Sequence, residues 1–285
     1  MPTAADASAL TADGTAAYKQ QVNAAAAALP DLDASPTVAI MRDVELDDVL
    51  QAGTVEHTIP YANLPHYPAS DGTLTIGTLG GTQVVELDQA FHLYDGHTPR
   101  EVSFPVRMLA TAGIDSLLLA APAGSVTAQA DRGDLMLLTD HINFQGQNPL
   151  VGPNVEEWGP RFPDMTAPYD AALRRRASDA AQREGISLRK GIYMGLLGPH
   201  HETTAEHRMA RRLGVDAVGT GVVPEVLAAR HMGVDVMALA LLTDQHLTEG
   251  QGAPSSEGPS LQTSRSQLHR LLVATVAANE QAGSR

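Results

Sequence analysis

The sequence contains no cysteine among its 285 residues. A disulfide framework, a thiolate metal site and a cysteine nucleophile are therefore excluded. Aromatic residues make up only 4% of the chain. No apolar run approaches the roughly 20 residues that a membrane-spanning helix needs; one of the longest covers only residues 236–242. No basic region followed by an apolar stretch opens the sequence, so we expect no secretory signal and a cytoplasmic protein.

Basic residues are also scarce. Lysine and arginine total 19 against 33 aspartates and glutamates, which gives a formal net charge of −14. Such an acidic surface argues against binding to nucleic acid or to anionic membranes, because both carry the same sign of charge. Hydrophobic residues make up 43% of the chain, which is typical of a folded globular protein.

Short apolar runs alternate with helical patterns along the chain, and this alternation predicts an α/β fold with a mixed central sheet flanked by helices. Gly80-Gly81 separates two apolar segments and predicts a hairpin. We find no internal repeat and no linker, so we expect one domain over residues 1–285, with residues 1–34 as an N-terminal helix and lead-in. Strands are predicted at residues 37–41, 73–79, 83–87, 116–120, 134–138, 191–197, 216–219 and 235–242, helices at 15–29, 169–184, 203–213, 224–232 and 264–278, and loops at 144–166 and 249–259.

In open α/β sheets ligands bind beyond the carboxyl ends of the strands, so the segments that follow strands are the candidates for a site. Glu202 follows a strand and a Gly-Pro turn and opens a helix. It can be a first-turn carboxylate favoured by the helix dipole, or it can accept N–H bonds from a planar ligand such as a purine. Asp244 ends the most apolar strand, where it can cap a turn or can bind and protonate a leaving base.

Other kinds of site have little support in the sequence. His200, His201 and His207 are the closest group of histidines, but no HExxH pattern is present, so we expect no metal. No Gly-rich phosphate loop of the GxGxxG or GxxxxGK[ST] type occurs, and no G-x-S-x-G element supports a serine hydrolase.

Several separate blocks resemble the trimeric purine nucleoside phosphorylase and methylthioadenosine phosphorylase family. Their order and spacing agree from about residue 35 to the C-terminal helix, which is nearly the whole chain. The blocks are residues 133–143 with 146–150, Gly198-Pro199-His200-His201-Glu202-Thr203 with Glu206, residues 213–219, residues 223–233, the strand ending at Asp244, and upstream residues 91–96 and 104–107.

The resemblance implies a homotrimeric pentosyltransferase of purine salvage, with inorganic phosphate as co-substrate and no other cofactor. In this reaction phosphate attacks the anomeric carbon of a purine nucleoside and the base leaves. Positions carried over from the family place the base beside His201, Glu202, Val218 and Asp244. They place the ribose beside Tyr94 and Thr220, and the phosphate near His92, with Asp244 and His92 in the catalytic roles.

The phosphate half of the family pattern is largely replaced. The first strand is followed by Arg42, Asp43 and Glu45 where the family has a Gly-Ser-Gly loop, and two carboxylates there would repel phosphate. Ala90 stands in place of an arginine and Gly221 in place of a serine. Arg42 is then the candidate for a rebuilt phosphate site.

Three hypotheses remain open at this point: a phosphorylase with a rebuilt phosphate site, a purine or nucleoside binder with weak or no catalysis, and a nucleoside hydrolase in which water replaces phosphate. Glu202 favours a 6-oxopurine because it can accept from N1–H. Asp244 favours a 6-amino group, so the sequence leaves the base preference open.

Overall fold

The computed structural model describes residues 11–32, 36–245 and 260–278, and its nine described strands form one mixed sheet. The strand order is β2-β3-β4-β1-β5-β8-β7-β6-β9, and β5 also pairs with β9. The strands are β1 Thr37–Arg42, β2 Thr54–Pro60, β3 Thr73–Leu79, β4 Thr82–Leu87, β5 Ser116–Ser125, β6 Leu135–Asn143, β7 Leu188–Gly195, β8 Ala217–Gly219 and β9 Asp235–Gln245.

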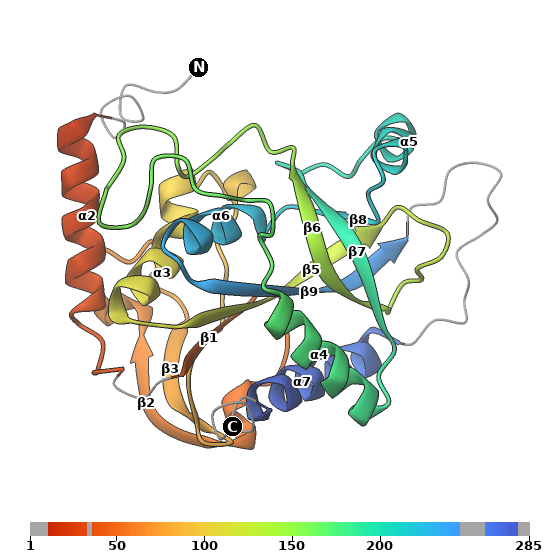
Figure 1. Ribbon diagram of the computed structural model, residues 1–285, viewed down its shortest axis with the longest axis horizontal. Helices are drawn as coiled ribbons and strands as arrows, with labels where there is room; N and C mark the ends of the chain where they lie inside the picture. Colours follow the sequence, from red (N-terminus) through yellow and green to blue (C-terminus); the bar gives the residue numbers. More distant parts are fainter. Residues whose placement is uncertain (1–10, 33–35, 246–259, 279–285) are drawn as a thin grey trace.

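The extra pairing of β5 with β9 closes part of the sheet into a ring of five strands. Around this ring β5 pairs with β8, β8 with β7, β7 with β6, β6 with β9 and β9 with β5. The remaining strands β1 to β4 continue from β5 as an open sheet that ends at the exposed strand β2 (Figure 1). The predicted mixed α/β fold is therefore confirmed.

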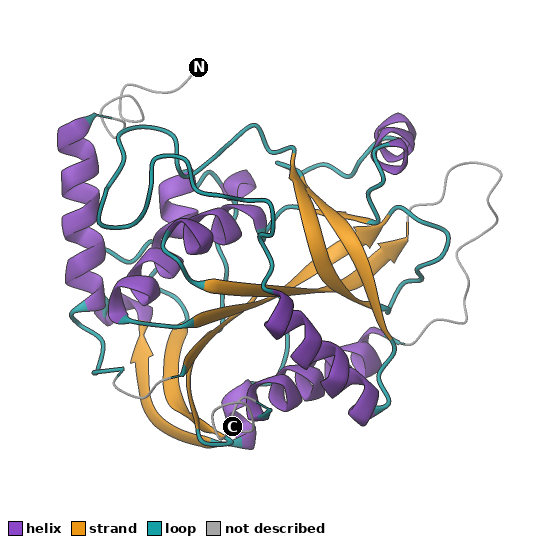
Figure 2. Cartoon of the chain, viewed as in Figure 1, coloured by secondary structure: helices purple, strands orange, loops and turns teal. Residues whose placement is uncertain are grey.

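Helices cover the sheet in two groups. Helices α2 (Ala12–Ala26), α3 (Pro99–Ala112) and α6 (Val223–His231) gather on one side, and α4 (Ala171–Glu184) and α7 (Leu261–Ala277) pack together on the other (Figure 2). Helix α5 (Thr204–Arg212) stands apart from both groups.

Alternating side chains along the strands pack against these two groups of helices. Ala39 and Met41 of β1 belong to the core beneath α2, α3 and α6, whereas Val38 and Ile40 belong to the core beneath α4 and α7. All six residues of β1 are buried, which is expected of a strand covered on both faces. The parity of a residue on β1 therefore decides which helices its side chain meets.

The local signals in the sequence explain most of these elements. Gly80 and Gly81 both have positive φ, 53° and 74°, which is what a two-residue hairpin between β3 and β4 requires. Helix α5 begins with a capping box between Thr203 and Glu206. Helix α4 begins at the cap Asp170 and ends at Gly185 in the left-handed conformation.

Several boundaries and two elements differ from the predictions. Strands β5 and β6 continue through residues 121–125 and 139–143, which we expected to be loops after the strands. The continuation is explained by ring closure, because β5 pairs there with β8 and β9 and thus gains partners for its backbone. Helix α3 and the edge strand β2 were not predicted; α3 carries Pro105 in its interior, which hid its helical pattern. The loop predicted at residues 249–259 lies outside the described residues.

No described helix is long and apolar enough to cross a membrane.

Candidate active site

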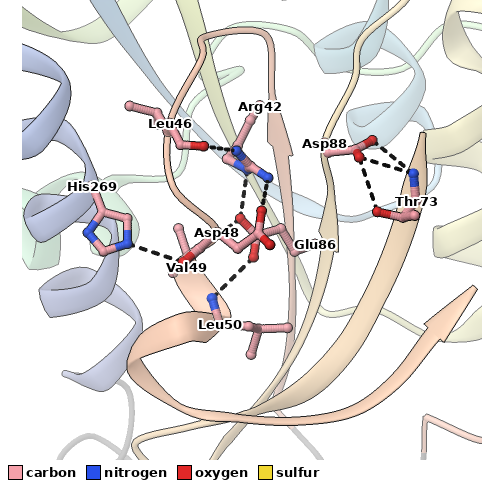
Figure 3. Close-up of polar contacts among 9 residues, drawn as sticks. All are labelled: Arg42, Leu46, Asp48, Val49, Leu50, Thr73, Glu86, Asp88 and His269. Carbon is pink, nitrogen blue, oxygen red and sulfur yellow. Dashed lines mark hydrogen bonds and ion pairs between the residues drawn. The ribbon is translucent and has the colours of Figure 1, made fainter. Parts of the chain in front are cut away.

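Arg42, the last residue of β1, and Asp43, the residue after it, direct their side chains to opposite faces of the sheet. Arg42 turns toward the α7 side, where its Nε forms an ion pair of 2.7 Å with Glu86 and its two terminal nitrogens bond to Leu46 O and Asp48 Oδ1, both at 2.6 Å (Figure 3). Arg42 is 5% exposed. All three of its nitrogens thus have partners within the protein, and this arrangement argues against Arg42 as a phosphate ligand.

Glu86 completes this buried ion pair. Its two oxygens also accept the backbone N–H groups of Val49 and Leu50, at 2.9 and 3.1 Å (Figure 3). Burial raises the pKa of the Glu86 carboxyl, and the amides and Arg42 act in the opposite direction. The segment after β1 is therefore folded back around Glu86 instead of forming an open anion-binding loop.

Asp43, the next residue, turns to the α6 side and meets His92. His92 Nε2 lies 2.9 Å from Asp43 Oδ1, and the His92 ring stacks on Tyr94 with centroids 4.7 Å apart. Although burial alone lowers the pKa of His92, the hydrogen bond and charge of Asp43 outweigh it, and the net pKa is raised. A proton on His92 is thus stabilised by Asp43.

Glu225 of α6 is the second carboxylate near His92, and sequence reasoning did not single it out. It is 2% exposed, and burial raises its pKa to about 7. The charges of His92 and Asp43 both act on it, which places the three groups in one cluster. The signal in the sequence was a glutamate within the otherwise apolar run of residues 222–229, where a buried carboxylate needs a reason.

The loop that joins β8 to α6 is held in an unusual backbone conformation. Val222 has a φ of 74° and a ψ of −50°, and Val223 N donates to Gly221 O at 2.9 Å, which is a γ-turn of the rare strained kind. Tyr193 OH donates to the same Gly221 carbonyl at 3.2 Å. This turn sets the position of Gly221 against Asp43 and His92.

A second part of the site lies between β7, β8 and α5. A cavity of about 240 Å³ is lined there by Glu202 and Val218 together with apolar side chains that include Met194 and Met209. Glu202 Oε2 lies 3.8 Å from His207 Nε2. This cavity combines mostly apolar walls with two carboxylates, Glu202 and Glu206, which suits a flat heterocycle that donates a hydrogen bond.

Two residues join the cavity to the Asp43 cluster. A Cβ placed on Gly198 would lie 2.9 Å from Thr220 and 3.5 Å from Tyr94, so both side chains lie against Gly198, which lines the cavity. Tyr94 in turn stacks on His92. Gln145 holds the Thr220 carbonyl through a bond of 2.8 Å. Tyr94 and Thr220 therefore lie between the two halves of the site, where a sugar would sit.

Two predicted base-binding residues, His201 and Asp244, do not line this cavity. His201 is exposed and does not line the cavity, whereas its neighbour His200 does. Asp244 is exposed near the end of β9, pairs with Gly124 of β5, and its carboxylate accepts from Thr243 Oγ1 at 2.9 Å. The structure thus groups Glu202, Val218, Tyr94, Thr220 and His92. Val218 and Asp244 both pair with Gly124 of β5, so these two residues lie at the same level of the sheet on either side of β5.

No described group of three or more histidines and carboxylates is arranged to hold a metal ion. The open hollow beside Arg42, with a volume of about 470 Å³, is also lined by four carboxylates, Asp43, Glu45, Asp48 and Asp88. Its charge is unfavourable for any anion.

Comparison with known proteins identifies the family. A family model described as the phosphorylase superfamily matches residues 38–277. This chain belongs to the phosphorylase superfamily. It is 38% identical to purine nucleoside phosphorylase 1 of Bacillus subtilis over 234 residues, which cover 79% of this chain and 86% of the relative. It is 36% identical to purine nucleoside phosphorylase of Bos taurus over 252 residues, or 84% and 87% of the two chains.

Solved structures of the superfamily share the fold. A purine nucleoside phosphorylase of Schistosoma mansoni with a monocyclic inhibitor aligns with a TM-score of 0.80 and 30% identity, covering 90% of this chain and 96% of that chain. Isoform 2 from the same organism, solved with cytosine and ribose-1-phosphate, also gives a TM-score of 0.80, at 28% identity and with 91% and 96% coverage. The resemblance that the sequence blocks indicated is thereby confirmed.

The buried ion pair gives a first prediction. Replacing Glu86 by Ala should lower the free energy of unfolding by about 3–5 kcal/mol, because Arg42 would stay buried without its charge partner. Asp48 is the matched control, since it contacts the same guanidinium with a side chain that is 53% exposed. Asp48→Ala should cost less than about 1 kcal/mol. Equal losses for the two variants in denaturant unfolding would contradict a burial-dependent ion pair.

Glu225 gives a prediction about pH. The folded protein holds a proton on this carboxyl up to about pH 7, whereas the unfolded chain releases it near the usual value of 4.5. The stabilisation is therefore complete below about pH 4.5 and is lost as the pH rises to about 7, with a total on the order of 3 kcal/mol.

Urea unfolding of the wild type and Glu225→Gln at several pH values measures this effect. The stability of the wild type relative to the variant should fall as the pH rises through this window. If the difference in the free energy of unfolding between the wild type and Glu225→Gln does not change with pH, Glu225 does not bind an extra proton in the folded state.

Proposed function

We propose that this chain is a purine nucleoside phosphorylase, which cleaves the N-glycosidic bond of purine ribonucleosides and 2′-deoxyribonucleosides and releases the free base and a sugar 1-phosphate. The observation that carries the proposal is the continuous site from Glu202, past Tyr94 and Thr220, to His92. The relatives that are named purine nucleoside phosphorylases support the reaction class. A cytoplasmic location in purine salvage belongs to the same proposal.

The cavity beside Val218 would hold the purine. Glu202 can accept the N1–H of a 6-oxopurine, and adenine lacks a proton at N1. The apolar walls exclude water, so the hydrogen bond to Glu202 would strengthen as negative charge develops on the departing base. Asp244 is proposed as an acceptor for a 6-amino group, because it pairs with the same Gly124 of β5 as Val218 of the cavity.

The sugar would lie over Tyr94 and Thr220. The transition state of glycosidic cleavage resembles an oxocarbenium ion, so positive charge develops on the ribose while the base gains negative charge. Asp43 and Glu225 lie on the far side of Tyr94 from the base cavity. The negative charge of Asp43 would stabilise the ribosyl cation, and Glu225 would add its charge only above about pH 7.

The assay of the base pocket is inosine cleavage. Wild-type protein should release hypoxanthine, and Glu202→Gln should lower kcat/KM for inosine about 10- to 100-fold, because a charge-assisted hydrogen bond contributes about 1.5–3 kcal/mol. Glu101→Gln is the matched control, because Glu101 forms the same kind of capping box with Thr98 on α3 and does not line the cavity. An equal loss in both variants would contradict a base-binding role for Glu202, and a wild type that does not cleave inosine or adenosine would contradict the proposed function.

The assembly is the second part of the proposal. Family members form homotrimers in which an aromatic side chain from one subunit reaches the active site of its neighbour, at the segment of residues 158–162. Of the two aromatics there, Trp158 is buried beneath Arg107, whose guanidinium lies 4.4 Å from the ring centroid. Phe162 is 87% exposed, which suits a contact with another subunit.

Light scattering should therefore give the mass of three subunits at micromolar concentration. Phe162→Ala should raise KM for the nucleoside while the unfolding midpoint stays within error, since an exposed ring contributes little to the fold of its own subunit. Val151→Ala, in the same loop and 55% exposed, is the control and should leave KM unchanged. A monomeric mass would contradict the proposal.

A further inference from the structure

Arg107 on α3 is a buried cation that has no carboxylate beside it in the part of the chain that the structure describes. It is only 3% exposed, and the charges that act on it come from Tyr18 and Arg100. Burial lowers the pKa of Arg107, and the like charge of Arg100 acts in the same direction. Arg100 itself is half-buried, and no described carboxylate acts on it either. Two guanidinium groups therefore lie close together where buried charges are normally paired with an anion.

The other side chains around Arg107 are neutral. Its Nη1 lies 3.5 Å from His231 Nδ1, and its guanidinium lies 4.4 Å from the centroid of the Trp158 ring. Burial and then the charge of Arg107 lower the pKa of His231, so this histidine is uncharged at neutral pH. Burial raises the pKa of Tyr18, so its hydroxyl stays protonated and supplies no negative charge. Neutral partners and an aromatic face offset only part of the cost of burying a guanidinium.

A small cavity lies against both arginines. Tyr18, Arg100 and Arg107 line it from helices α2 and α3, and residues 149–158 of the long connection beside α2 line it from the other side (Figure 1). No carboxylate is among the described residues that line it. Its volume is about 20 Å³. Since one water needs about 10–15 Å³, the cavity has room for one monatomic anion and is too small for phosphate.

We propose that this cavity is a halide site, in which chloride binds between the guanidinium groups of Arg100 and Arg107. The ion offsets the repulsion between the two cations and holds the connection of residues 149–158 against α2 and α3. This site goes beyond the proposed function, since it shares no lining residue with the base cavity. The activity and the halide site can therefore be tested separately.

The first experiment uses the fluorescence of Trp158, the only tryptophan in the sequence. The probe is bromide, which replaces chloride and quenches tryptophan as a heavy atom. Sodium bromide is titrated into the wild-type protein in place of sodium gluconate at constant ionic strength. Because Trp158 is 9% exposed, collisions with bromide in the solvent contribute little. The proposal expects quenching that saturates and that chloride reverses.

Three results of this titration overturn the proposal. The first is quenching that rises linearly with bromide, which indicates collision without binding. The second is saturable quenching that chloride does not reverse. The third is reversal by phosphate that matches reversal by chloride at equal ionic strength, because phosphate does not fit the cavity.

The second experiment assigns the ion to the two arginines. Arg107→Met removes the charge and keeps a long side chain over Trp158, so the variant should fold and lose the saturable quenching. Arg100→Met should weaken the binding of bromide about 10-fold or more, because it removes charge-assisted hydrogen bonds to the ion. Arg175→Met is the matched control, since Arg175 is exposed on α4 and the change in net charge is the same. Saturable quenching that both site variants retain at the wild-type affinity overturns the proposal.

The third experiment measures stability. An ion that binds only the folded protein raises the unfolding midpoint as its concentration increases. The midpoint of the wild type should therefore be higher in sodium chloride than in sodium gluconate of equal ionic strength, by more than in Arg107→Met. Subtracting the shift of the variant removes the general effect of the two salts on folding. Equal shifts in the wild type and in folded Arg107→Met overturn the proposal, and Arg175→Met should shift like the wild type.

Discussion

The placement of Asp43 beside His92 and Glu225 depends on the ion pair between Arg42 and Glu86. This pair is buried on one face of the sheet, and it fixes the parity with which β1 ends. Since neighbouring side chains on a strand point to opposite faces, the pairing of Arg42 leaves Asp43 on the other face, against His92 and α6. A shift of one residue would place a guanidinium in the site and a carboxylate in the core beneath α7. The carboxylate of Asp43 thus faces His92 because the guanidinium of Arg42 is paired with Glu86 on the other face of the sheet.

The two halves of the site differ in how charge is balanced. The base cavity has mostly apolar walls with the carboxylates of Glu202 and Glu206, and it is suited to a neutral heterocycle that becomes electron-rich in the transition state. The other half contains Asp43, Glu225 and His92, whose charges act on one another. The carboxylate of Asp43 would stabilise a ribosyl cation, so its charge favours breaking of the glycosidic bond.

Sequence patterns predicted the fold and the base half more fully than the half around His92. Apolar alternation, caps and the Gly80-Gly81 turn are local signals, and the elements that depend on them were predicted with small shifts in their ends. Ring closure is a long-range constraint, so the extension of β5 was missed. His92, Glu202 and Val218 were identified from family blocks, but the direction of Arg42 depends on Glu86, 44 positions later in the chain, and no local pattern shows that pairing. Glu225 was missed because burial of a whole helix is a tertiary property.

The ring formed by β5, β6, β7, β8 and β9 has a consequence for ligand exchange. In an open sheet a cleft can widen when strands at a free edge bend apart, but every strand in this ring pairs with a neighbour on each side over part of its length. Admission of a nucleoside must therefore be controlled by the segments that rest on the ring, chiefly the long connection of residues 144–169 and the turn at Val222. The barrier to release of product would then be set by the opening of these segments, and the rate of turnover and the rigidity of the reacting groups can be adjusted separately.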